Sequence, residues 1–137
     1  MLGAISGQVG PVGAGIASGS IITIVIYTFG HVSGAHVNPA LSISAVYLGE
    51  LDRHLLPGYI VAQMLGSAAA GLFLLWAVGD YGKMGVNIPN TDIGVTIPVA
   101  LAIEFFLSFL LMWVICGTAY HHKALVKFAG LAIGATV

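Results

Sequence analysis

The first part of this sequence has no Lys, Arg, Asp or Glu between Met1 and Gly49. A chain needs about 20 predominantly apolar residues to cross a lipid bilayer as a helix. A second uncharged run extends from His54 to Gly79, and an apolar segment after Thr96 contains a single acid, Glu104. These runs predict an all-α membrane protein.

Composition supports this prediction, since 58% of residues are hydrophobic, only 7% are charged, and the mean hydropathy is +1.02. Soluble domains carry about 25% charged residues. With four Lys and Arg and a net charge of -1, the chain lacks the basic face that nucleic-acid binding requires. The single cysteine, Cys116, cannot form an intrachain disulfide and is predicted to be a small core residue.

Membrane segments are predicted at Pro11–Phe29, Leu55–Val78 and Ile97–Thr118, and a last one begins near Phe128. From there only about ten residues remain before Val137, half of what a crossing requires. Cytoplasmic loops are enriched in basic residues. The spans place Arg53, Lys123 and Lys127 on one side and Lys83 on the other, so the first side is expected to be cytoplasmic.

Small residues and aromatic residues recur at positions that suggest how the spans pack. Small residues four apart allow membrane helices to approach closely, although membrane helices are also simply rich in glycine. Aromatic residues near span ends are typical of interface anchors. The small pairs are Gly15 and Gly19, Ser67 and Gly71, and Gly130 and Gly134, and the aromatic residues are Tyr59, Trp76, Tyr81 and Tyr120.

The segment GHVSGAHVNPALS, Gly30 to Ser42, interrupts the first uncharged run. Gly30, Gly34 and Pro39 disfavour one continuous helix. Non-helical backbone at membrane depth is tolerated only where it is buried in protein or lines a wet cavity. Residues 31–37 are therefore predicted to be non-helical, with carbonyl groups facing such a cavity.

A short helix is predicted to follow this break. Asn38 suits the N-cap, and Pro39 and Ala40 suit the first turn. A helix from Pro39 to Leu48 would be about 15 Å long, half the hydrocarbon thickness. Its N-terminus, with about half a positive charge, would lie near the midplane, where it would oppose cations and favour neutral, oxygen-bearing solutes.

The sequence SGAHVNPA, Ser33 to Ala40, resembles the first NPA box of the major intrinsic proteins, the aquaporin and glycerol-facilitator family. YIVAQMLGS, IEFFLSFLLMWVICGTA and FAGLAIGATV are similar to that family's third, fourth and fifth helices. The resemblance implies part of a right-handed helix bundle with one re-entrant half-helix. Residues 1–137 would be a partial domain, from the second span to the start of the fifth, without the first span, the second NPA box, the filter arginine and the last span. A truncated or partial reading frame is the expected explanation.

The resemblance also implies roles for individual residues. Gly34, Ala35 and His36 would supply pore-lining carbonyls, with His36 also bracing the loop, and Asn38 would donate to the permeating solute. Pro39 and Ala40, which complete the NPA box, would belong to the same pore-lining set. Glu104 matches a buried structural acid that accepts hydrogen bonds from a pore loop, so architecture is expected of it rather than solute contact. An ionisable residue within a span is in any case a functional candidate.

Ser18 stands twenty positions before Asn38, at a selectivity position in this family. A serine there resembles the nodulin-like branch and its bacterial relatives, whose wide filters pass glycerol, urea or metalloid acids. The alternative is that Ser18 is a small packing residue beside Gly19.

No metal or other cofactor is expected, because the histidines lack an HExxH or similar spacing. They are His31, His36, His54, His121 and His122. A membrane enzyme is disfavoured as well, since Ser33 and His36 have no nearby acid to orient the histidine.

The predicted function is a passive channel for water or small uncharged solutes. The alternative is a non-conducting structural or interacting membrane subunit. The expected surroundings are a lipid bilayer and small neutral solutes, in a multi-pass protein of the plasma membrane. By resemblance, a complete protein would be a homotetramer.

Overall fold

The computed structural model describes residues 10–79, 89 and 94–137. Within these ranges the chain is helical and contains no strand. The helices are α2 (Gly10–Ser33), α3 (Pro39–Tyr47), α4 (Leu56–Val78), α5 (Ile97–Ile115), η3 (Cys116–Tyr120), η4 (Val126–Phe128) and α6 (Ala129–Thr136). The prediction of an all-α membrane protein is confirmed.

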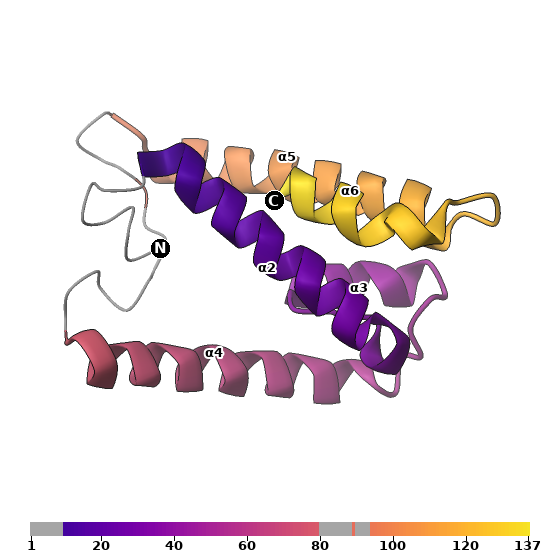
Figure 1. Cartoon of the computed structure of the whole chain (residues 1–137), viewed down its shortest axis with the longest axis horizontal. Helices are drawn as coiled ribbons and strands as arrows, with labels where there is room; N and C mark the ends of the chain where they lie inside the picture. The colour runs from indigo at the N-terminus through magenta and orange to yellow at the C-terminus, as the bar shows by residue number, and fades with distance from the viewer. Residues whose placement is uncertain (1–9, 80–88, 90–93) are drawn as a thin grey trace.

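Three helices are long and apolar enough to cross a bilayer: Gly10–Ser33, Leu56–Val78 and Ile97–Tyr120. α5 and α6 lie side by side, α4 lies on the opposite side of the molecule, and the short α3 lies between α4 and α5, while α2 crosses the bundle diagonally (Figure 1). No residue of α4 is buried within the chain. Its apolar side chains therefore face the bilayer or further protein.

The predicted spans at Leu55–Val78 and Ile97–Thr118 are confirmed to within two residues, because α5 continues into η3. η3 is a π-helical turn, closed by a hydrogen bond of 2.9 Å from the His121 N–H to the Cys116 carbonyl. A π turn is rare and often marks a functional position.

The predicted start of the break at Gly30 is wrong, because α2 continues through His31 to Ser33. An interior glycine costs a helix only about 1 kcal/mol. In the bilayer core no water can replace a lost intrahelical hydrogen bond, so interrupting a helix there costs more than in water. The helix ends where the backbone turns left-handed, at Gly34 with φ 68°, so the non-helical stretch is residues 34–38.

α3 has a defined cap at each end. Asn38 has extended backbone angles, and its side-chain oxygen accepts a hydrogen bond from the Ala40 N–H, as the sequence predicts for an N-cap. At the other end Gly49 has φ 78°, its N–H donates to Val46, and the Glu50 N–H donates to Ala45. This is a Schellman ending. With nine residues, α3 is about 13 Å long, less than half a bilayer core.

α2 and α6 pack with their backbones in contact. A Cβ at Gly19 would collide with the carbonyl oxygen of Gly134, and a Cβ at Gly134 would collide with the Thr23 hydroxyl. The Thr23 Oγ1 also donates across the contact to the Gly130 carbonyl at 3.1 Å. The predicted close approach through small residues thus holds for Gly19, Gly130 and Gly134, whereas Gly15 and Gly71 have open space around them.

The structure bears on two basic residues of the orientation prediction and on one of the predicted aromatic anchors. The turn between α3 and α4, which contains Arg53, and the turn after η3, which contains Lys123, lie at the same end of the molecule (Figure 1). Lys83 and Tyr81 lie outside the described residues. Trp76 is 81% exposed, as an anchor would be.

Tyr59 and Tyr120 do more than anchor helix ends, because their hydroxyl groups bond inside the protein. The Tyr59 hydroxyl donates to the Ser33 carbonyl at 2.8 Å and so satisfies the end of α2. A carbonyl at a helix end has no partner in its own helix. Tyr59 therefore ties α4 to the point where α2 stops.

Candidate pore-lining site

The loop between α2 and α3 is built on two successive left-handed residues, Gly34 with φ 68° and Ala35 with φ 53°. The His36 ring folds back over Gly34, so that a Cβ at Gly34 would lie 3.0 Å from Nε2 of His36. Position 34 therefore requires glycine for two reasons: its left-handed backbone angle, and the lack of space for a Cβ beneath the His36 ring. Alanine at a left-handed position costs of order 1 kcal/mol and persists only where the surroundings hold it.

The His36 side chain is held by aromatic residues from two other elements. Its Nε2 lies 3.1 Å from the Tyr120 hydroxyl of η3, and its ring centroid lies 5.6 Å from that of Tyr59 of α4. Its Nδ1 is buried without a hydrogen-bond partner among the described residues. The loop is thereby attached to both sides of the bundle, as a brace would be.

The backbone of the loop is held by Gln63 of α4. Its Nε2 donates to the His36 carbonyl at 2.7 Å and to the Ser42 hydroxyl at 2.9 Å. Ser42 is fully buried, and its hydroxyl donates to the Asn38 carbonyl at 3.3 Å. Sequence reasoning overlooked both residues. The available signal was a lone amide in an otherwise apolar span, where polar side chains usually bond to another helix.

Asn38 joins the loop to α3 and lines the cleft that is described below. Its Oδ1 is used by the Ala40 N–H at 2.9 Å. Among the described residues, no atom accepts a hydrogen bond from its Nδ2. The amide thus caps the half-helix with one atom and keeps two N–H groups free with the other.

A cleft of about 710 Å³ opens beside this loop. Four of the residues predicted for the pore line it, namely Gly34, Ala35, His36 and Asn38. Pro39 and Ala40 do not line it, because they form the first turn of α3. The remaining wall comes from α2, α3, α5, η3, η4 and α6 and includes Ile22, Ile26, His31, Leu41, Leu111, Tyr120, Lys127 and Ile133.

Ser18 is half-buried in α2 and does not line the cleft. It stands four residues before Ile22, which does line it. Residues four apart share one face of a helix. Ser18 therefore lies on the cleft-facing side of α2, one turn beyond the described wall, and also directly beside the packed Gly19.

Glu104 is exposed on α5, so the predicted burial of this acid is not met within the described residues. The reason is local: the described neighbours of α5 are α3, η3 and α6, and they leave this part of the helix uncovered. The described residues thus do not enclose Glu104 as the prediction assumed.

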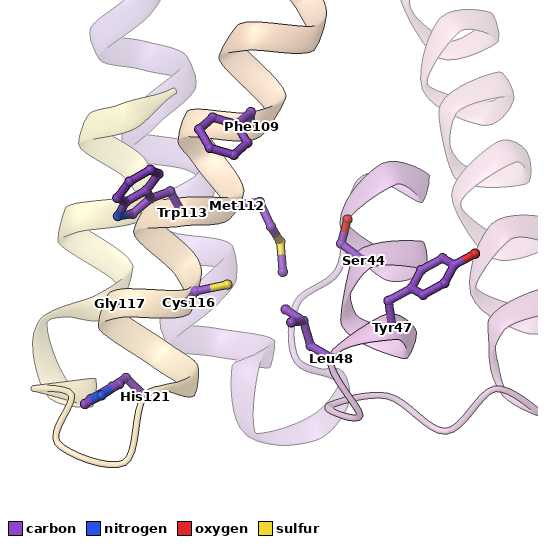
Figure 2. Close-up of a pocket in the computed structure, with 9 residues that line it drawn as sticks. All are labelled: Ser44, Tyr47, Leu48, Phe109, Met112, Trp113, Cys116, Gly117 and His121. Carbon is purple, nitrogen blue, oxygen red and sulfur yellow. The ribbon is translucent and has the colours of Figure 1, made fainter.

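A second hollow of about 580 Å³ lies between α3 and the end of α5 (Figure 2). Met112 points across it toward α3, and the Cys116 sulfur points into it (Figure 2). Cys116, which was predicted to be a small core residue, is half-buried. The walls are largely apolar, and none of the loop residues 34–38 contributes to them. The hydrogen-bonding groups converge on the cleft beside the loop instead, which makes that cleft the candidate site.

No cluster of three or more His, Cys, Asp or Glu residues is placed to hold a metal ion in the part of the chain that the structure describes. The histidines are spread apart, except that the rings of His121 and His122 are adjacent, with centroids 4.3 Å apart.

The short apolar helix α3 thus begins with Asn38 as its N-cap and with Pro39 and Ala40 in its first turn, and Asn38 lines the cleft. A family model described as Major intrinsic protein matches residues 4–137. The chain belongs to this family, and its similarities place it in the nodulin-like branch.

Three relatives show the extent of the match. Nodulin-26 of Glycine max is 39% identical over 126 residues, covering 91% of this chain and 45% of the relative. Aquaporin NIP1-1 of Arabidopsis thaliana is 39% identical over 130 residues, covering 91% and 44%. A probable aquaporin NIP-type of Nicotiana alata is 39% identical over 126 residues, covering 87% and 43%. The chain thus spans slightly less than half the length of these relatives.

Proposed function

We propose that this chain forms part of a passive channel for water or small uncharged solutes, with the cleft beside residues 34–38 as part of the conduit. The observation that carries the proposal is the Asn38 side chain. Its oxygen caps α3, none of the described residues accepts a hydrogen bond from its Nδ2, and the residue lines the cleft. A neutral solute with an oxygen atom is the partner that suits such a donor.

The charges around the cleft favour neutral solutes over cations. None of the described lining residues is Asp or Glu, whereas the basic residue Lys127 is among them. The N-terminus of α3 adds about half a positive charge. A cation entering here would meet repulsion and would find no carboxylate to replace its water. Such chemistry is passage rather than catalysis, in keeping with a family whose aquaporins are channels and not enzymes.

Within this class we propose glycerol, urea and metalloid acids as solutes. The support is the small side chain of Ser18, one turn above the cleft wall on the same face of α2. A bulky residue there would narrow the path. Packing beside Gly19 remains the alternative role for Ser18.

We also propose that the chain corresponds to the second span through the start of the fifth span of a complete channel. The support is its coverage of 45% of Nodulin-26 and the exposed Glu104. On this proposal further protein segments complete the pore wall, and the complete protein is a homotetramer in the plasma membrane. The open wall of the cleft is the observation that supports the competing proposal, a non-conducting membrane subunit.

Solute-driven swelling of proteoliposomes tests the channel proposal when they carry the extended protein, that is, this chain together with the further segments that are proposed to complete the pore wall. Asn38→Asp keeps an oxygen acceptor for the cap but removes the Nδ2 donor, so glycerol and urea flux should fall while helicity is retained. Ser44→Ala is the matched control on α3, because its hydroxyl bonds only to Ala40 of its own helix. Flux no greater than that of empty vesicles, with inserted wild-type protein, would leave the subunit proposal.

A further inference from the structure

We infer that Gln63 is a positioning residue that sets the direction of the pore-loop carbonyl groups and thereby the solute preference of the channel. This inference deepens the proposed function and rests on it. Gln63 does not line the cleft. It acts from α4 through hydrogen bonds to the loop and to α3.

The first step is that the orientation of the Gln63 amide is determined by its partners. Its Nε2 faces the His36 carbonyl oxygen at 2.7 Å and the Ser42 hydroxyl at 2.9 Å. If the amide were turned over, its oxygen would face the carbonyl oxygen of His36, and oxygen atoms without a hydrogen between them repel. Both N–H groups are therefore committed to the loop and α3.

The second step is that these bonds control the backbone and not only a side chain. The His36 carbonyl is drawn toward α4, while the neighbouring Ala35 is held at φ 53°. Through Ser42 the same amide reaches the Asn38 carbonyl. Gln63 thus connects to both ends of the turn that presents Asn38 to the cleft.

The third step is that, among the described residues, Gln63 supplies the side-chain donor to the His36 carbonyl and no second donor is bonded there. Tyr120 and Tyr59 hold the His36 ring and the end of α2, but neither bonds to the carbonyl groups of His36 or Asn38. Without Gln63 the His36 carbonyl and the buried Ser42 hydroxyl would lack their donor. A backbone carbonyl in that position turns toward the nearest water, which is in the cleft, because burial without a partner is costly.

The experiment compares Gln63→Met, which keeps the length and removes both donors, with Gln63→Glu. A protonated Glu can donate one hydrogen bond and an ionised Glu none. Met64→Leu is the control, since Met64 is the next residue on α4 and is 64% exposed. The extended protein, with the further segments that are proposed to complete the pore wall, is reconstituted in vesicles as wild type and as each variant. The fluxes of water, glycerol and urea are measured between pH 5 and pH 8, with hydrogen exchange of amides 35–42.

We expect Gln63→Met to change the glycerol-to-water flux ratio by about three- to tenfold, the size of one or two hydrogen bonds. Exchange in residues 35–42 should accelerate while the rest of α4 stays protected. Gln63→Glu should approach the wild-type ratio as the pH falls, and Met64→Leu should match wild type throughout. A purely structural role would lower all fluxes together and leave their ratio unchanged.

Two failures are distinguishable. If the wild-type chain conducts but Gln63→Met keeps its flux ratio and its loop exchange, the inference about Gln63 is overturned and the channel proposal stands. If inserted wild-type protein passes no solute, the channel proposal fails, and the flux part of the inference fails with it.

Discussion

Two of the contacts between helices in this small bundle depend mainly on different physical means. α2 and α6 approach through glycines, so closely that a Cβ at Gly19 would enter the backbone of α6. α3 and α4 are joined by side-chain hydrogen bonds from Gln63 to Ser42 and to the His36 carbonyl. The first contact depends on glycines, which have no Cβ atom, and the second depends on hydrogen bonds that the Gln63 side chain donates.

The difference follows from the solvent. Lipid is as apolar as the helices, so burying apolar side chains does not drive helices together, and close packing or interhelical hydrogen bonds must do so. Packing suits the long α2, whose backbone groups are satisfied internally. Hydrogen bonds suit the loop of residues 34–38 and the start of α3, where carbonyl groups need outside partners.

The strongest challenge to the packing contact is Gly19→Ala. The added methyl group collides with the Gly134 carbonyl, so a loss of about 2–3 kcal/mol in the free energy of unfolding is expected. Unfolding in detergent titrations, followed by helicity, measures it. Gly15→Ala in the same helix has open space and should be neutral or slightly stabilising. Equal losses in the two variants would show that helix propensity, not contact, is being measured.

Gly34→Ala challenges the polar side of the comparison. The left-handed φ of 68° and the overlying His36 ring should together cost about 1–2 kcal/mol. Gly30→Ala is the control, since Gly30 lies inside α2 and its nearest contact, to Ile26, is an ordinary 3.9 Å. The same detergent titration applies. A larger loss for Gly30→Ala would restore the break that the sequence suggests at that residue.

Ser42→Ala sharpens the comparison within α3. Removing the buried hydroxyl takes away the acceptor of Gln63 and a donor to Asn38, so a loss of about 1 kcal/mol is expected. Ser44→Ala removes only a bond within α3 and should have almost no effect. A double variant with Gln63→Met should lose less than the sum of the single variants, because the two residues share a bond. Additive losses would contradict the contact.

Tyr27→Phe should have the smallest effect. The Tyr27 hydroxyl donates to the Lys127 carbonyl at 2.9 Å from an exposed position, so its loss should cost at most about 0.5 kcal/mol. The same unfolding measurement suffices. A loss comparable with that of Ser42→Ala would mean that the α2 and α6 contact also relies on hydrogen bonds at its edge.

Much of the fold could be predicted from the sequence because local rules decide it. Long apolar runs predict α4 and α5, and Asn38 with Pro39 predicts the start of α3, since capping depends on neighbours in sequence. The break was misplaced at Gly30 because several glycines compete as helix ends, and only the backbone angle at Gly34 selects one.

The candidate site was predicted less completely. Gly34, Ala35, His36 and Asn38 lie in one motif and indeed line one cleft. Gln63 and Ser42 escaped notice because their roles depend on which faces of α3 and α4 meet. Tyr120 was interpreted as an interface anchor, although the π turn of η3 directs its hydroxyl to His36.

The sequence by itself determined that the chain enters a membrane, where its long helices lie and that a capped half-helix begins at Asn38. Those properties depend on the hydropathy of runs and on hydrogen bonds between near neighbours. Only the tertiary structure decided that Gly19 meets Gly134, that Gln63 holds the loop and that Glu104 is left exposed. Contacts between helices depend on how each helix is rotated, and small residues and single hydrogen bonds across the bundle determine that rotation.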